Sequence, residues 1–355
     1  MQINTLLKKY QTLFGGNLAR VKCFTQMILG IIISGNVQQH KCSLGFQGKS
    51  HQESTCRRIR RFLSQFSFCK ADIAKALVLM LSLSGPMRLS LDRTNWKFGC
   101  LEINLLVLAV VVNSQFAFPL FWAALPKAGN SNFKERIDLL QLFIKTFGSK
   151  KILFLTGDRE FIGKKWVDFL MQEKIPFFIR IKENRLIHNG EEKKHLTLFF
   201  KHLQTGQKRF LECDLDGYRV YLAGTRSSAG ELVIVMSNQD KREQILSIYK
   251  KRWTIERLFF NSKTNGFNLE DTHLKSLSRI ENLMAVLASA MVLSFLVGQH
   301  QEQKRRTPYK KTVKSPAYST FRRGFDFIRH FLIKSFQEAL GFLSLLIPEN
   351  LPIFI

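Results

Sequence analysis

Apolar residues in the middle of the chain form short runs that end in polar or turn residues, a pattern that predicts buried strands. We expect strands at Arg88–Asp92, Leu101–Asn113, Phe116–Leu125, Lys151–Gly157 and Pro176–Lys182. Helical periodicity separates some of these runs, at about Asn132–Phe147 and from Gly163 to Lys174. Strands and helices that alternate in this way are typical of an α/β domain.

The pattern changes between residues 183 and 240. Three period-2 or β-rich runs occur there, separated by turn residues: Phe210–Asp214, Tyr218–Ala223 and Leu232–Ser237. We interpret 183–240 as a strand-rich insertion into a core of residues 85–300, which begins after the break Ser84-Gly85-Pro86. Residues 1–84 are predicted to be a helical N-terminal DNA-binding region, and residues 301–355 a basic linker followed by a C-terminal helical region.

The C-terminal third contains one long apolar helix, predicted at Leu277–Val297. Its most apolar part, Leu283–Val297, is shorter than the roughly 20 residues that a spanning helix needs. We therefore expect it in the core of the fold and expect no membrane partner. Gln301–Ser315 is predicted to be a loop, and helical patterning returns over Tyr318–Leu346.

Composition narrows the choice of partner. The chain has 54 Lys and Arg against 27 Asp and Glu, a formal net charge of +27. Such an excess is typical of proteins that bind polyanions such as DNA. Four arginines, Arg57, Arg58, Arg60 and Arg61, surround a short apolar seam in the N-terminal region. They fit either an end-DNA-binding helix or an ordinary charged, solvated helix.

The six cysteines are scattered, and neither CxxC pairs nor Cys/His spacings of a zinc site occur. Reduced thiols in a cytoplasmic protein are the expectation. A metal site would then depend on carboxylates alone, which favours Mg²⁺ or Mn²⁺ over Zn²⁺.

Candidate chemistry is concentrated between Tyr249 and Lys263. At about 100° per residue on an α-helix, Tyr249, Arg252, Glu256 and Lys263 share one narrow stripe. One carboxylate among fixed cations suits a metal-bound acid whose neighbours hold phosphates. A solvated face with an Arg252–Glu256 ion pair fits the same spacing.

Two aspartates upstream favour the first interpretation. Asp92 lies at or near the end of one predicted strand, and Asp158 directly follows another. Ligand and catalytic groups collect at the carboxyl ends of strands in open α/β sheets. Either aspartate alone fits a turn or a helix cap. Two aspartates followed by a helical glutamate in a basic helix are harder to attribute to caps.

Together these motifs resemble the DDE transposases of the type-four group of bacterial insertion sequences. The signature of that group, Tyr-x2-Arg-x3-Glu-x6-Lys, is complete here at Tyr249, Arg252, Glu256 and Lys263. The segments around Asp92 and Asp158 are also similar. The resemblance covers about residues 85–300 and implies a ribonuclease H-like α/β mixed-sheet core with a strand-rich insertion, flanked by helical N- and C-terminal regions.

The resemblance also implies an activity and its residues. The protein would cut DNA at the ends of an insertion sequence and join the 3′ ends to target DNA. Asp92, Asp158 and Glu256 would be the catalytic residues and the ligands of two divalent cations, Mg²⁺ or Mn²⁺. Tyr249, Arg252 and Lys263 would bind DNA phosphates. Expected partners are double-stranded DNA, both terminal inverted repeats and target, and a second copy of the chain in the assembled complex.

Several alternatives remain open at this point. A ribonuclease H-like nuclease without strand transfer and a non-catalytic DNA-binding repressor both fit parts of the pattern. The insertion lacks the tryptophan that stacks a flipped base in well-studied members of the group, so Tyr218 and Tyr221 are the available aromatic residues. Arg159 and Glu160 fit either a supporting role near the site or the start of a helix.

Overall fold

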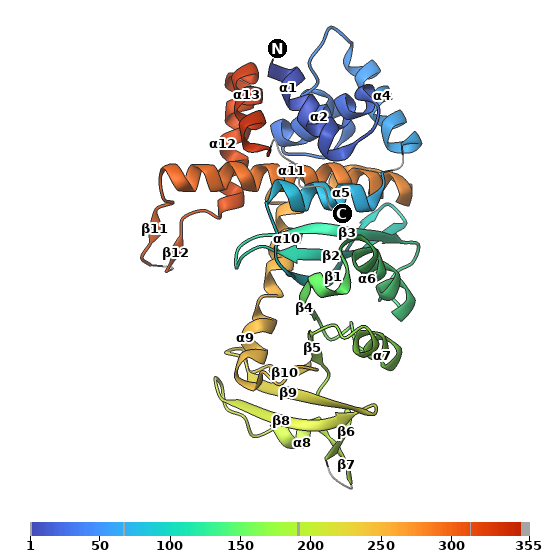
Figure 1. The fold of residues 1–355 in the computed structure, drawn as a ribbon, viewed down its shortest axis with the longest axis vertical. Helices are drawn as coiled ribbons and strands as arrows, with labels where there is room; N and C mark the ends of the chain where they lie inside the picture. Colours follow the sequence, from blue (N-terminus) through green and yellow to red (C-terminus); the bar gives the residue numbers. More distant parts are fainter. Residues whose placement is uncertain (1, 67, 190–191, 313, 349–355) are drawn as a thin grey trace.

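A computed structural model describes residues 2–66, 68–189, 192–312 and 314–348. The remaining positions of the expected N-terminal region, insertion and C-terminal region lie outside the described residues. One large sheet runs through the molecule, with a helical layer at one end and the strands of the insertion at the other (Figure 1).

The helical layer is formed by the N-terminal helices, which pack on α11 (Leu277–Lys304) in one continuous hydrophobic core. Figure 1 shows α11 lying between most of these helices and the central strands, whereas the last N-terminal helix lies beside α11, next to the strands. The N-terminal helices are α1 (Gln2–Phe14), α2 (Leu18–Ser34), α3 (Gln39–Ser43), α4 (Gln52–Gln65) and α5 (Lys70–Met80).

Helix α11 is long and apolar enough to cross a membrane by length and composition, but 83% of its most apolar window is buried inside the fold. It extends to Lys304, beyond the predicted end at Val297, so the expected loop begins later than Gln301. Two further helices pack against it or against each other: α12 (Thr320–Lys334) and α13 (Phe336–Leu346). Between α11 and α12 lies a two-stranded ribbon, β11 (Tyr309–Lys310) with β12 (Ser315–Pro316).

The central strands follow the order β3-β2-β1-β4-β5. Strands β1 to β3 are antiparallel neighbours, whereas β1, β4 and β5 run parallel. Their bounds, with the intervening helices, are β1 (Met87–Phe98), β2 (Leu101–Val111), β3 (Ala117–Leu125), α6 (Phe133–Phe147), η1 (Ser149–Lys151), β4 (Ile152–Gly157), α7 (Lys164–Gln172) and β5 (Phe177–Ile181).

The predicted C-terminal end of the strand Arg88–Asp92 was wrong. Strand β1 continues through Asp92 to Phe98, because residues after Asp92 keep their antiparallel pairing with β2 as far as Phe98 and Leu101. Asp92 therefore lies in the middle of a strand. It nevertheless marks the point at which the parallel pairing of β1 with β4 ends, at Leu91 and Gly157.

The insertion does not form a separate sheet. Strand β10 pairs with β5, and the order continues as β10-β9-β8-β6-β7, so all ten strands belong to one sheet. The elements are β6 (Leu186–Asn189), β7 (Glu192–His195), α8 (Leu196–Phe200), β8 (Lys208–Leu215), β9 (Tyr218–Arg226) and β10 (Leu232–Ser237).

The stretch that follows the insertion is not one continuous α-helix, as the helical-wheel argument assumed. A short η2 (Arg242–Gln244) leads into α9 (Ile245–Lys250), and α10 (Trp253–Ser262) follows after a tight turn at 251–252. In this turn the Arg252 amide donates to the Tyr249 carbonyl at 2.9 Å, an i→i−3 bond. Lys263 caps the end of α10, and η3 (Leu269–Thr272) connects it to α11.

Candidate active site

Sheet register brings Asp92 and Asp158 together. Leu91 of β1 and Gly157 of β4 are parallel partners, so the next residue of each chain segment is one of the two aspartates. Each carboxylate accepts the backbone N–H of the residue that follows it, Arg93 or Arg159, at 2.8 Å. A short hydrogen bond to the backbone restrains both side chains at the same edge of the pairing.

Helices α9 and α10 face these aspartates. The Tyr249 hydroxyl donates to Asp158 Oδ1 at 3.3 Å, and Arg252 Nη1 donates to Asp92 Oδ2 at 3.2 Å. Arg252 Nη2 donates to Glu256 Oε1 at 2.7 Å. Asp92 and Glu256, which are 164 positions apart in the sequence (256 − 92), thus share one guanidinium. This guanidinium also lies 5.7 Å from the centroid of the Tyr249 ring, so five of the predicted site residues form one connected group.

Packing explains why α9 lies here. A second hydrophobic cluster, separate from the main core, contains Ile245, Ile248 and Tyr249 of α9 together with residues of β4, β5, β9 and β10. The insertion strands therefore form part of the surface on which α9 is held. In α10, Ile255 and Leu258 are buried in the main core, and this leaves Glu256 on the exposed side.

Burial dominates the electrostatics of Asp92. It raises the pKa of this carboxyl to about 6; Arg252 and the Arg93 amide oppose the rise, and Asp158 and Glu160 add to it. Burial also raises the pKa of Tyr249 to about 12. Burial disfavours the Arg252 cation, but the surrounding negative groups outweigh this effect and raise the pKa of the guanidinium.

Glu160 pairs with a residue that sequence reasoning did not select. Arg93 Nε lies 3.0 and 3.1 Å from the two Glu160 oxygens, and Arg93 Nη2 donates to Asn130 Oδ1 at 2.9 Å. Helix α7 begins only at Lys164, so Glu160 is not a helix-start residue. The pair fixes the loop after β4 onto β1. The sequence feature that could have indicated this pair is the Asp-Arg dipeptide that occurs in both segments, at Asp92-Arg93 and at Asp158-Arg159, with Glu160 next to the second.

Lys263 lies apart from the connected group. Its Nζ is 2.7 Å from Glu270 and 3.4 Å from the Asn95 carbonyl, three residues beyond Asp92 on β1. The N-terminal arginines also diverge. Arg57 pairs with Glu53 at 3.8 Å, whereas the other three line two different pockets: Arg60 lines one, and Arg58 and Arg61 line the other.

The aromatic residues near the site are distributed differently from the expectation. Tyr221 lies in β9 with the Arg242 guanidinium 5.9 Å from its ring, and a hydrogen bond with Asp168 raises the pKa of Tyr218. These contacts lie within the protein, so stacking of a DNA base on Tyr218 or Tyr221 stays a prediction. By contrast, Trp253 and Phe260 of α10 are 65% and 56% exposed, on the side of the helix that carries Glu256.

The donor groups of the site are carboxylates, and these suit Mg²⁺ or Mn²⁺ in chemistry. No group of three or more His, Cys, Asp or Glu side chains is arranged to hold a metal within the described ranges. The Arg252 guanidinium lies between Asp92 and Glu256, at 3.2 and 2.7 Å from their oxygens. A cation bound to these residues would compete with Arg252 for both.

Comparison with known proteins gives two results. A family model described as the transposase DDE domain matches residues 85–293. The cryo-EM structure of a piggyBac transposase synaptic complex with hairpin DNA is similar, with a TM-score of 0.50 and 12% identity over 95% of this chain and 78% of that chain. This similarity confirms the predicted ribonuclease H-like α/β fold. None of the curated proteins matches the chain.

Proposed function

The chain belongs to the transposase DDE domain family, and we propose that it cuts DNA at the ends of an insertion sequence of the type-four group and joins the freed 3′ ends to target DNA. Membership makes it a DNA-cutting and DNA-joining enzyme. The observation that supports our assignment of the site is the connected group in which Arg252 bridges Asp92 on β1 and Glu256 on α10, beside Asp158.

We propose that Asp92, Asp158 and Glu256 hold two divalent cations, Mg²⁺ or Mn²⁺. When bound, such cations activate water and stabilise the charge that develops on the leaving 3′ oxygen. The all-carboxylate donor set supports this proposal. Ionised Asp92 is required for it, and ionised Asp92 is the form that burial disfavours and a nearby cation favours.

The other residues would position these carboxylates and the DNA. Tyr249 orients Asp158 through its hydroxyl, and Arg252 orients Asp92 and Glu256. We propose that a phosphate of the cleaved strand takes over part of the Arg252 contacts, because a guanidinium can engage phosphate with two parallel donors. Lys263 would bind a phosphate further along β1 as a point charge.

The proposed cleavage and joining reactions need only water and DNA as reactants, without a nucleotide cofactor. In the first step water attacks phosphorus, the bond from phosphorus to the 3′ oxygen breaks, and that oxygen takes a proton. In the second step the freed 3′-hydroxyl loses its proton and its oxygen bonds to a phosphorus of target DNA, while the bond from that phosphorus to the target 3′ oxygen breaks and that oxygen takes a proton. Neither step requires ATP or a covalent enzyme intermediate.

Double-stranded DNA is the proposed partner, both as terminal inverted repeats and as target. The net charge of +27 and the DNA in the similar piggyBac complex support this choice. Two element ends must be processed together, and we therefore propose a homodimer in the assembled complex, located in the cytoplasm and on the nucleoid when bound to DNA.

The test uses a plasmid that carries the gene with its natural flanking DNA, incubated with purified protein and Mg²⁺. We expect 3′-hydroxyl ends at the element boundary and products joined to a second plasmid. Asp92→Asn, Asp158→Asn and Glu256→Gln should abolish both, whereas the exposed Asp138→Asn on α6 should not. Nicks without joined products would indicate a nuclease, and binding without cleavage by the unaltered protein would indicate a repressor.

A further inference from the structure

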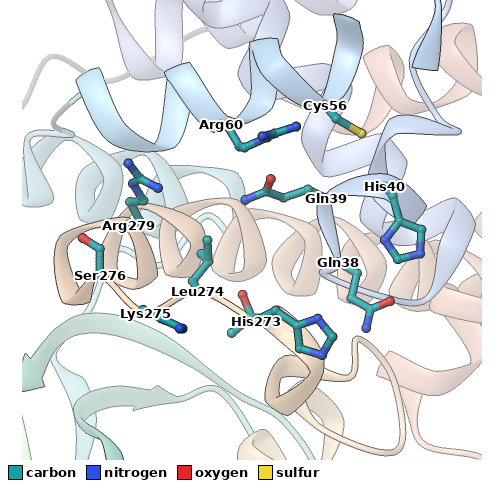
Figure 2. A pocket seen from close by; sticks show the side chains of 11 residues that line it. Gln38, Gln39, His40, Cys56, Arg60, His273, Leu274, Lys275, Ser276 and Arg279 are labelled. Carbon is teal, nitrogen blue, oxygen red and sulfur yellow. The ribbon is translucent and has the colours of Figure 1, made fainter. Parts of the chain in front are cut away.

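A basic pocket lies between the N-terminal helices and the start of α11. It has a volume of ≈ 620 Å³ and is lined by residues 38–40, 56 and 60 on one side and 272–276 and 279 on the other. Figure 2 shows Arg60 and Cys56 on α4 across the hollow from Arg279 and Ser276, with His40 and His273 at one end. Any ligand in this pocket would contact both the N-terminal helices and the catalytic region.

The lining is cationic. Arg60, Lys275 and Arg279 contribute full charges, and the lining contains no Asp or Glu. Within the part of the chain that the structure describes, neither Arg60 nor Arg279 is found in an ion pair. The Lys275 ammonium lies 5.9 Å from the Phe98 ring centroid. Charges that no carboxylate neutralises attract an anion from solution.

The N-terminus of α11 opens into the same pocket. Ser276 occupies the N-cap position but provides no capping hydrogen bond, and its hydroxyl instead lies 2.9 Å from the Ser278 hydroxyl. The first turn of this 28-residue helix contains no acidic residue. Among the described residues, the first backbone N–H groups of α11 therefore have no side-chain acceptor, and the helix dipole favours a negative charge there.

An independent observation concerns Thr272, another lining residue. Its side chain is buried, at 3% exposure, and its hydroxyl has no hydrogen-bond partner within the described structure. A buried hydroxyl without a partner is unfavourable, because it has lost its hydrogen bonds to water and gained none in the fold. Thr272 lines the pocket, so a rotation of its side chain would bring the hydroxyl to an acceptor oxygen of an anionic ligand bound there.

The pocket has a defined position relative to Asp92. The His273 ring stacks on Phe98 at 4.9 Å between centroids, so the segment before α11 is packed on the end of β1. Phe98 is six residues beyond Asp92 (98 − 92) on a strand with uninterrupted pairing to β2. At about 3.3–3.4 Å per residue this separation is about 20 Å. Duplex DNA advances about 3.4 Å per base pair, so 20 Å corresponds to about six base pairs.

We propose that this pocket binds backbone phosphates of duplex DNA about six base pairs from the cleavage site, with Arg60, Arg279 and the N-terminus of α11 as the main contacts. The inference rests on the proposed function and adds to it a second anchoring point that joins the N-terminal helices to the catalytic core. A DNA phosphate is favoured over a free anion because the pocket lies along the strand that carries Asp92.

The test measures how DNA binding depends on salt for Arg60→Ala/Arg279→Ala, without metal, so that the outcome does not depend on cleavage. Each lost phosphate contact lowers the slope of log K against log salt by about 0.9. We therefore expect the slope to fall by about 1.8, which is roughly a tenfold smaller loss of affinity between 50 and 200 mM salt. Lys22→Ala/Arg305→Ala removes the same charge from the exposed side of α2 and from the far end of α11, outside the pocket, and should leave the slope near that of the unaltered protein.

Duplex length provides the second arm. End-matched duplexes of about 4 and 12 base pairs should differ in affinity for the unaltered protein much more than for the Arg60/Arg279 variant. Arg60→Lys/Arg279→Lys should retain most of the slope, which separates lost charge from misfolding. An unchanged slope, an equal fall in the control pair, or competition by inorganic phosphate that is independent of duplex length would each overturn the proposal. If the protein failed to cleave DNA but gave the expected binding results, the proposed function would be contradicted and the phosphate-binding pocket would not.

Discussion

Arg252 holds two carboxylates at once, and distance and burial give opposite rankings for the two ion pairs. The Glu256 pair is shorter, at 2.7 Å against 3.2 Å for Asp92. However, the Glu256 side chain is 47% exposed, and the Asp92 side chain only 17%. Coulomb attraction is about 5 kcal/mol for the Asp92 pair at an effective dielectric constant of 20, and about 1.5 kcal/mol for the Glu256 pair at 80.

We therefore predict that burial decides the ranking. After desolvation of the charges, the Arg252–Asp92 coupling should be about 1.5–3 kcal/mol, and the Arg252–Glu256 coupling below about 1 kcal/mol. The assay is a pair of double-mutant cycles on the metal-free protein with Arg252→Met, Asp92→Asn and Glu256→Gln. Urea unfolding followed by tryptophan fluorescence gives the free energies of unfolding.

Arg252→Met keeps most of the aliphatic volume, so the cycles report charge rather than a cavity. Glu256 is the internal control, because it lies on the same guanidinium with a shorter contact. A coupling energy for Glu256 equal to or larger than that for Asp92 would refute the reasoning, since solvent screening would then not control the strength of these pairs.

Three further predictions concern chemistry, pH and packing. Glu256→Gln should abolish cleavage while gel-shift binding of element DNA survives, because the carboxylate itself repels phosphate; near-normal cleavage in Mg²⁺ would make Glu256 an ordinary surface residue. Burial raises the pKa of Asp92 from 3.8 to about 6, so the stability contributed by its protonated carboxyl is fully present below about pH 4. About 3 kcal/mol of the free energy of unfolding is lost as the pH rises through about 6. Urea unfolding should show this loss in the metal-free protein but not in Asp92→Asn. Gly298→Ala would place a Cβ 1.8 Å from the Thr320 carbonyl oxygen and should destabilise the α11–α12 contact by about 1–3 kcal/mol, whereas Gly85→Ala, with open space around it, should be nearly neutral in the same measurement.

Local patterns were sufficient to predict most elements and the residues of interest. Apolar runs placed one strand directly before Asp158 and another that was expected to end at or near Asp92. Helical spacing placed Glu256 four residues after Arg252, where they do form an ion pair. These features depend on neighbours within a few residues, and hydrophobic periodicity reports such neighbours directly.

Only the tertiary structure decided which of these residues meet. The parallel register of β1 with β4 sets Asp92 beside Asp158, and the packing of α9 on the insertion strands brings Tyr249 to Asp158. The same packing buries Arg252 against Asp92 rather than leaving it on a solvated face.

Lys263 shows the reverse case, because its spacing matched the helical stripe but the end of α10 turns it toward Glu270. The pocket between α4 and α11 has no local signature at all, since its two sides are more than 200 residues apart in the chain (272 − 60 = 212). Contacts between distant segments depend on strand register and helix packing, which no short window of sequence contains.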